Sequence, residues 1–344
     1  MSAVEVQAAG LVTAVGLTAA ASAAALRARI MRFRETPFLD AGGSPVIGAP
    51  IRGMADGELG TQRLATLLCA ALDDAARQLG EPIPDGTPLV LGLAERERAG
   101  RPPGLESQLA DAIVRDAGWR FDEATSSVVA TGNTSGARAF ELARRVLERG
   151  APRVVVACVD SFLNAPALAQ LQAAERLKSE DDPDGVIPGE AAGALVLGAA
   201  LDGARSRARL AVAGAGFARE SAAADRARPN TGVGLAAAIR ACLSDARAGT
   251  RNTDFRLSDV SGERRAFVET QYAMSRTLAE SHADYPLWLP AESFGEIGAA
   301  SVPAQLAVAA ASFAKGYAPG RAALCQSGSA DGDRAVLFAV ALAG

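Results

Sequence analysis

The composition of the chain limits which side chains could carry out catalysis. The 344 residues include one histidine, His282, and four cysteines, Cys69, Cys158, Cys242 and Cys325. A mechanism or zinc site that needs two imidazoles from this chain is therefore excluded. The cysteines are dispersed through apolar runs without CxxC spacing, which predicts four buried thiols in a reducing compartment. We expect His282 to lie on the surface.

Two glycine-containing turns could present polar side chains at the beginning of a helix. Thr131–Ala137 reads TGNTSGA and Phe294–Ala300 reads FGEIGAA, and each is followed by an apolar-periodic helix, a glycine and an apolar strand. Asn133 suits a helix N-cap, and the two hydroxyl residues after it suit capping of the first turn. Alternatively, Ser135 or Thr134 could attack an acyl group with Glu296 as base, although a hydroxyl activated only by a carboxylate is poorly matched to neutral pH.

Both turns belong to a repeated unit. A short apolar strand that ends in glycine precedes each of them, at Val6–Gly10 and at Leu210–Gly214. The polar stretch Asp202–Arg209 separates the two units, which predicts halves at residues 1–203 and 204–344. Strands that alternate with helices predict an α/β protein, and duplication of the unit stacks two sheets with helices between and outside them.

Charge and hydropathy argue against several kinds of partner. The 35 basic and 39 acidic residues give a net charge of −4, which offers no general attraction for nucleic acid or anionic lipid. The uncharged stretch Val6–Leu26 contains glycines and threonines and lacks a basic start, so it predicts a buried strand and helix rather than a membrane span or signal peptide. We expect a cytoplasmic protein without cofactor or metal, because the sequence has no P-loop, Rossmann fingerprint or metal-ligand spacing.

Three further stretches are rich in Arg, Asp, Pro and Gly and interrupt the apolar pattern. Such composition is typical of surface loops or insertions. The stretches are Ala94–Gly104, Glu220–Thr231 and Gly249–Arg265.

One block of the sequence identifies a family resemblance. Asp184–Gly193 reads DGVIPGEAAG and is similar to the DGFVxGEGAG block of the β-ketoacyl synthases of the thiolase superfamily. Ala9–Gly16, AGLVTAVG, resembles the opening GLGxVTPLG segment of that family. The resemblance implies a thiolase-like five-layer αβαβα fold built from two similar halves, in agreement with the repeated unit. For Glu190, inside the block, we expect a structural role as an acceptor of backbone N–H groups.

The resemblance also identifies the positions at which the family carries its Cys-His-His catalytic residues. Asn133 matches the cysteine of a TACSSG-like turn, Ser261 the first histidine in an AHGTGT-like turn, and Glu296 the second in a GHxxGAAG-like turn. A carboxamide cannot form a thioester, so the resemblance predicts that no catalytic residue is intact. A vestigial acyl pocket would be lined by Gly132, Thr134, Ser135 and Gly295.

These exchanges predict a catalytically inactive ketosynthase-like protein, homologous to acyltransferases, that acts as a bacterial accessory or adaptor protein for a protein cargo. The chain resembles bacterial ketosynthase-like proteins with degraded active sites, some of them encoded beside type VI secretion effectors, and this resemblance implies such effectors as one class of cargo. Two alternatives stay open: a chain-length-factor-like partner of an active ketosynthase, and a weak acyltransferase or hydrolase that uses Ser135. Relatives with this fold form twofold dimers near the nucleophile turn, so we expect a homodimer or a pair with a ketosynthase-like partner that buries Ser126–Thr131.

Overall fold

The computed structural model describes residues 3–180, 182–199, 209–223, 228–278 and 285–342. Within this part of the chain, strands form a ten-stranded mixed sheet in the order β10-β9-β11-β12-β8-β1-β7-β6-β4-β5, and β2 pairs with β3 separately. The strands are β1 (Val4–Val12), β2 (Arg34–Leu39), β3 (Pro45–Gly48), β4 (Leu89–Leu93), β5 (Ser127–Ala130), β6 (Arg153–Ser161), β7 (Glu190–Ala199), β8 (Leu210–Arg219), β9 (Phe255–Ser258), β10 (Leu287–Trp288), β11 (Ala322–Gly328) and β12 (Asp333–Ala341).

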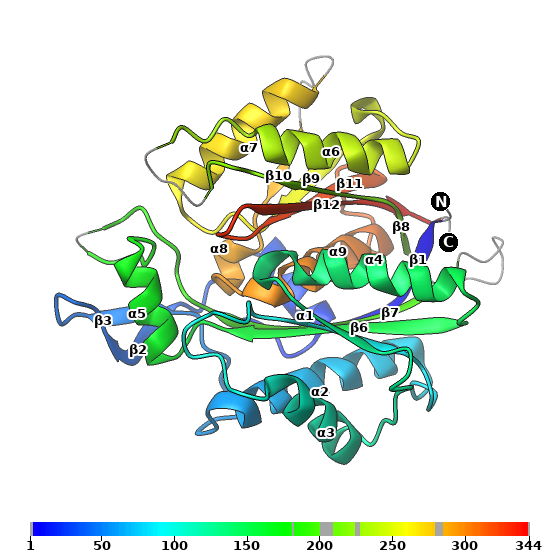
Figure 1. Ribbon diagram of the computed structural model, residues 1–344, viewed down its shortest axis with the longest axis horizontal. Coiled ribbons are helices and arrows are strands. Elements are labelled where there is room, and N and C mark those ends of the chain that lie inside the picture. The colour runs from blue at the N-terminus through cyan, green and yellow to red at the C-terminus, as the bar shows by residue number, and fades with distance from the viewer. Residues whose placement is uncertain (1–2, 181, 200–208, 224–227, 279–284, 343–344) are drawn as a thin grey trace.

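The helices complete five layers. They are α1 (Ala19–Arg27), α2 (Gly60–Leu79), α3 (Leu105–Asp116), α4 (Ser135–Glu148), α5 (Ala165–Ala173), α6 (Val233–Asp245), α7 (Arg264–Thr277), α8 (Ala291–Phe294) and α9 (Ser301–Ala314). In Figure 1, α2 and α3 cover one outer face, α6 and α7 cover the other, and α1, α4 and α9 fill the space between the two halves of the sheet. The predicted αβαβα architecture is therefore confirmed.

The two halves of the sheet join along one short strand contact. Val4–Val6 of β1 pairs antiparallel with Leu210–Val212 of β8, and the N-terminal half continues through β7, β6, β4 and β5. These two strands contain the predicted apolar segments before each turn, and the predicted strand and helix within Val6–Leu26 are β1 and α1. The predicted boundary at residue 203 lies outside the described residues.

Close packing of small residues brings the layers together. Gly10 of β1 lies directly against α2, where an added Cβ would come within 1.9 Å of the Ala71 carbonyl oxygen. No other residue fits this contact without displacing the helix backbone. Larger side chains, among them Phe140 and Phe255, fill the layer between the two halves of the sheet. All four cysteines are free and buried, as the sequence predicts.

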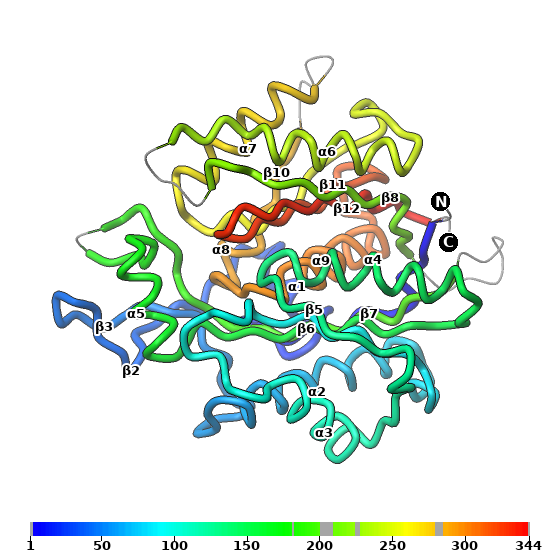
Figure 2. The backbone as a smooth tube through the Cα atoms, viewed as in Figure 1, coloured from blue at the N-terminus to red at the C-terminus, as the bar shows by residue number. Residues whose placement is uncertain are grey.

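A smaller unit lies at one end of the molecule. The hairpin of β2 and β3 and the helix α5 lie together there in both views (Figures 1 and 2). Val46 of β3, Phe162 and Leu168 of α5 form a small apolar cluster of their own. This unit borders the cavity described below, which Phe162 also lines.

Two stretches predicted as surface loops contribute to the interior instead. Gly249–Arg265 contains the strand β9, whose Phe255 and Leu257 are fully buried. Ala94–Gly104 contains Arg98, whose side chain is 8% exposed. Ala94–Gly104 is a loop, as predicted, apart from the buried Arg98 side chain, whereas the prediction was wrong for Gly249–Arg265. Polar composition does not distinguish a solvated stretch from one whose charges are paired inside the protein.

Candidate functional site

Two helix N-termini meet between the two halves of the ten-stranded sheet. The short 3-10 helix η1 (Gly132–Thr134) leads into α4, and η4 (Gly298–Ala300) leads into α9. The repeated turns predicted from sequence are thus structurally equivalent. At the level of single residues, Asn133 corresponds to Ala299, and Glu296 lies three residues earlier on the second turn.

Three residues predicted from the family resemblance lie in direct contact. The Asn133 amide donates from Nδ2 to Glu296 Oε1 at 2.9 Å, and Ser261 Oγ donates to Glu296 Oε2 at 2.5 Å. Glu296 Oε1 also accepts the Gly298 N–H at 3.0 Å. A side chain that the sequence did not single out, Asp259, accepts a second bond from Asn133 Nδ2 at 3.1 Å. Both amide hydrogens of Asn133 are therefore held by carboxylates.

Asp259 is the most strongly perturbed carboxyl group of this cluster. Burial raises its pKa to about 7, and repulsion from Glu296 acts in the same direction. The Gly328 N–H, which donates to Oδ2 at 2.9 Å, the Asn133 amide and Arg334 oppose the rise. Asp259 consequently exchanges its proton near neutral pH in the folded protein.

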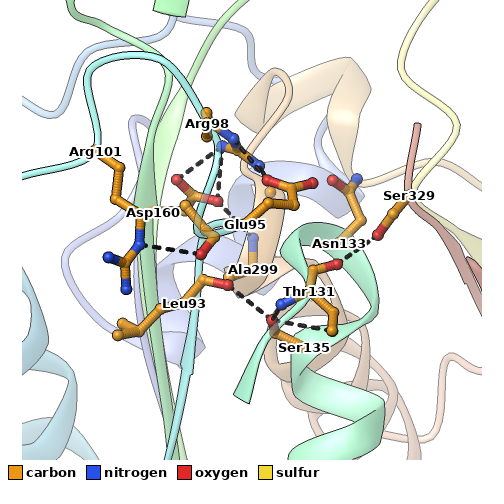
Figure 3. A network of polar contacts seen from close by, with 12 residues as sticks. Leu93, Glu95, Arg98, Arg101, Thr131, Asn133, Ser135, Asp160, Ala299 and Ser329 are labelled. Atoms are coloured by element: carbon orange, nitrogen blue, oxygen red, sulfur yellow. Dashed lines mark hydrogen bonds and ion pairs between the residues drawn. The ribbon is translucent and has the colours of Figure 1, made fainter. Parts of the chain in front are cut away.

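The capping roles predicted for the first turn are wrong. The N-cap residue of α4 is Thr134, and its side chain makes no capping bond. Asn133 lies inside η1 rather than before it, and its amide nitrogen donates to the two carboxyl groups. Ser135 Oγ donates to the Leu93 carbonyl at 2.8 Å and accepts the Thr131 N–H at 2.8 Å (Figure 3).

An ion-pair cluster of Arg98, Asp160 and Glu95 lies beside the two turns, next to the end of β6. Arg98 donates to both Asp160 oxygens at 3.0 Å and pairs with Glu95 (Figure 3). Burial opposes the charge of Arg98, but the two carboxylates outweigh it and raise its pKa above the ordinary value. Asp160 also accepts the Ala299 N–H at 2.9 Å, so this cluster fixes the second turn of the site.

The cluster of polar side chains around Asn133 borders a cavity of about 400 Å³. Asn133, Asp259, Ser261 and Glu296 all line it. Of the predicted pocket residues, Gly132, Thr134 and Ser135 are buried and do not line this cavity, and Gly295 lines a small adjoining space of about 10 Å³. η1 places these three residues in the layer between the two halves of the sheet, and the vestigial acyl pocket stays a prediction.

Glu190 has the structural role predicted for it. Its Oε1 accepts the Ile51 N–H at 2.8 Å, and its Oε2 accepts Arg63 Nε at 2.8 Å. The side chain is fully buried and ties β7 to the loop before α2.

Other candidate groups lie elsewhere or cannot be placed. His282 lies outside the described residues. Burial raises the pKa of the Cys158 and Cys325 thiols to about 12, so neither supplies a thiolate near neutral pH. The described residues contain no cluster of three or more potential metal ligands, and none of the helices among them is long and apolar enough to cross a membrane.

Comparison of the sequence with known proteins gives one distant relative and no matching family model. The relative, described as an actinorhodin polyketide β-ketoacyl synthase 2 of Streptomyces coelicolor, is 28% identical over 204 residues. The matched segment spans 56% of this chain and 49% of that protein, so the match covers about half of each.

Solved structures resemble the chain over its whole length. One matching chain comes from the solved complex of a type II polyketide acyl-carrier protein with its ketosynthase. The match covers 99% of this chain and 100% of the chain in that complex, with a TM-score of 0.83 and 14% identity. A ketosynthase in complex with its chain length factor from Xenorhabdus doucetiae matches 99% of this chain and 98% of that one, with a TM-score of 0.77 and 15% identity. The chain therefore has the thiolase-like ketosynthase fold.

Proposed function

We propose that this chain is a ketosynthase-fold protein that does not condense acyl groups and acts by pairing with a second chain of the same fold. The observation that carries the proposal is the Asn133 amide, which is held between Glu296 and Asp259 at the head of α4. A carboxamide in this position supplies no nucleophile. The alignment that equates Asn133, Ser261 and Glu296 with Cys-His-His is part of the proposal.

The energetic costs of the residue exchanges argue against condensation by this chain. Loss of an oxyanion donor costs about 2.7–4 kcal/mol. An ionised Glu296 about 4 Å from a malonyl carboxylate or enolate adds repulsion of about 4 kcal/mol at an effective dielectric constant of 20. Together these effects slow the reaction by at least about 10⁴-fold, before the missing nucleophile is counted.

We expect neither the native chain nor Asn133→Cys to decarboxylate or condense malonyl thioesters above background. A cysteine at this position would face two carboxylates, which disfavour its thiolate. Product formation measured by mass spectrometry, with a Cys-His-His ketosynthase as positive control, checks this expectation. Turnover by Asn133→Cys well above that of the native chain would contradict it.

The exposed edge of the sheet supplies the surface for pairing. Among the described strands, β5 hydrogen-bonds to β4 on one side and ends the sheet on the other, and Ser127 and Val128 are exposed. An unpaired strand edge can pair with a second strand across a twofold axis. Solved ketosynthases in complex with chain length factors have the fold of this chain, which supports a heterodimer as the form of the pairing.

Val128→Asp tests the pairing surface. Because Val128 is 36% exposed in the single chain, we expect the variant to fold with less than about 1 kcal/mol loss of stability and to dissociate the complex at micromolar concentration. Light scattering of the chain alone, and co-purification with a Cys-His-His ketosynthase from the same source, measure the effect. Val114→Asp on α3, 41% exposed, is the matched control and should leave the complex intact.

Two outcomes distinguish pairing from the other functions predicted from sequence. A native chain that stays monomeric and retains no ketosynthase contradicts pairing and favours the adaptor for protein cargo, type VI secretion effectors included. Incubation with acyl-CoA followed by intact mass measurement tests the acyltransferase that would use Ser135. The full burial of Ser135 and its three bonds to backbone groups argue against an acyl adduct.

A further inference from the structure

A second cavity, of about 350 Å³, is separate from the cavity at Asn133. Neither Asn133 nor Glu296 lines it, and its walls come from four stretches of chain that lie far apart in the sequence. These stretches are 26–33, 178–187, 260–267 and 289–293. A cavity of this size, formed where distant parts of the chain converge, is large enough to hold a small molecule.

Apolar side chains form most of the wall of the second cavity. Phe33, Ile187, Phe267 and Leu289 each line it from a different stretch of the chain. Met31 lines it as well and is 63% exposed, so the cavity opens to solvent beside a flexible apolar side chain. This wall favours the hydrocarbon part of a ligand that enters from solvent.

Two cations line the second cavity, and neither has a carboxylate partner. Arg29 and Lys178 are both exposed residues on its wall. In the described part of the chain no ion pair involves either side chain, and Lys178 Nζ donates to the Pro183 carbonyl at 3.0 Å. Among the described residues that line this cavity, Glu292 is the one carboxylate, and it is exposed. The lining side chains therefore carry a positive net charge.

The arginines of the first cavity differ in this respect. Arg98, Arg176 and Arg334 each pair with a carboxylate. A cation whose charge is not neutralised within the protein attracts an anionic group of a ligand. An apolar wall with two such cations on its exposed side matches a ligand that has a hydrocarbon body and an anionic head.

We propose that the second cavity binds a medium-chain alkanoate, whose hydrocarbon chain lies against Phe33, Phe267 and Leu289 and whose carboxylate lies toward Arg29 and Lys178. An ammonium head on the same chain would be repelled by the two cations. A short carboxylate would meet the cations but would leave the apolar wall uncovered. The proposal is independent of the proposed pairing, because no lining residue of this cavity belongs to β5.

The experiment uses the full chain and decanoate, with decylamine as the probe of opposite charge and butanoate as the short probe. At about pH 7.5 and about 150 mM salt, we expect calorimetry to show saturable binding of decanoate at one site. Decylamine should bind at least about fivefold more weakly, and butanoate at least about a hundredfold more weakly. Equal affinity of either probe and decanoate, or no saturable binding of decanoate up to about 5 mM, overturns the proposal.

Charge variants test the contact with the carboxylate. Arg29→Gln should weaken decanoate binding about fivefold, whereas Glu292→Gln should strengthen it, because that variant removes the negative charge from the wall. Arg32→Gln is the matched control: Arg32 is exposed and close in sequence but does not line the cavity, so the affinity should change less than about twofold. Equal weakening by the two arginine variants would show a general charge effect and overturn the proposed contact.

Arg29→Gly separates binding from stability. Arg29 has a φ of 54° directly after Ala28, the C-cap of α1, and glycine is the usual residue at such a position. The variant should therefore unfold at the same temperature as the native chain or above it, and should lose affinity as Arg29→Gln does. A lower unfolding temperature with unchanged affinity would assign Arg29 a structural role and contradict its contact with the ligand.

A pair of neighbouring residues tests the apolar wall. Met31 and Ile30 are 63% and 44% exposed, and only Met31 lines the cavity. Met31→Ser should weaken decanoate binding about threefold or more, and Ile30→Ser should change it less than about twofold. Equal effects of the two variants would place the hydrocarbon chain outside this cavity. Circular dichroism confirms that each variant is folded.

Discussion

Arg98→Met should lower the free energy of unfolding by about 3–5 kcal/mol, because it leaves buried carboxylates without their cation. Arg98 and Asp160 are 8% and 3% exposed in this ion pair, and Glu95 binds the same guanidinium. Burial also raises the pKa of Asp160, so the remaining carboxyl group can relieve part of the cost by taking up a proton. We therefore expect a larger loss at pH 8 than at pH 5.

Thermal and denaturant unfolding of Arg98→Met and Arg96→Met measure this effect. Arg96 is the matched control: it pairs with Glu106 at 3.0 Å, but its side chain is 65% exposed. An exposed pair contributes about 0–1 kcal/mol, so Arg96→Met should change little. Equal losses in the two variants would mean that burial of the Arg98 cluster has no energetic consequence.

The sequence predicts the fold well because the fold depends on local patterns. The glycine turns before α4 and α9, the apolar strands β1 and β8, and the DGVIPGEAAG block are each contained within about ten residues. Periodicity and turn residues report such elements directly. The same holds for Glu190, whose neighbours in the block supply the family resemblance.

The site could be predicted only in part, because its polar contacts join distant parts of the chain. Asn133 and Asp259 are 126 positions apart, and Arg98 and Asp160 are 62 apart. No spacing rule connects such pairs, and Asp259 and Arg98 both lie in polar stretches that favour a loop interpretation. The capping prediction for Asn133 failed for the same reason, since it considered only the neighbours within one turn. A strand followed directly by a charged residue, as β9 is by Asp259, is the one local signal that could have identified the cluster.

Asp259→Asn should remove a pH dependence from the stability of the protein. The pKa of Asp259 is about 7 in the folded chain, whereas an aspartate in an unfolded chain has a pKa of about 3.9. Between these values the folded state holds a proton that the unfolded state has lost, so the free energy of unfolding falls as pH rises. This contribution is fully present below pH 4 and lost as pH passes through 7.

The expected size follows from the same two pKa values. From pH 5 to pH 8 the native chain should lose about 2–3 kcal/mol relative to Asp259→Asn, at about 1.4 kcal/mol per pH unit until Asp259 is ionised. The variant keeps an oxygen for the Asn133 amide and the Gly328 N–H, so its hydrogen bonds are preserved. Asp331→Asn, an exposed carboxylate on the wall of the same cavity, is the control and should run parallel to the native chain. If Asp259→Asn also runs parallel to the native chain between pH 5 and pH 8, Asp259 is ionised throughout that range and its burial does not control its proton.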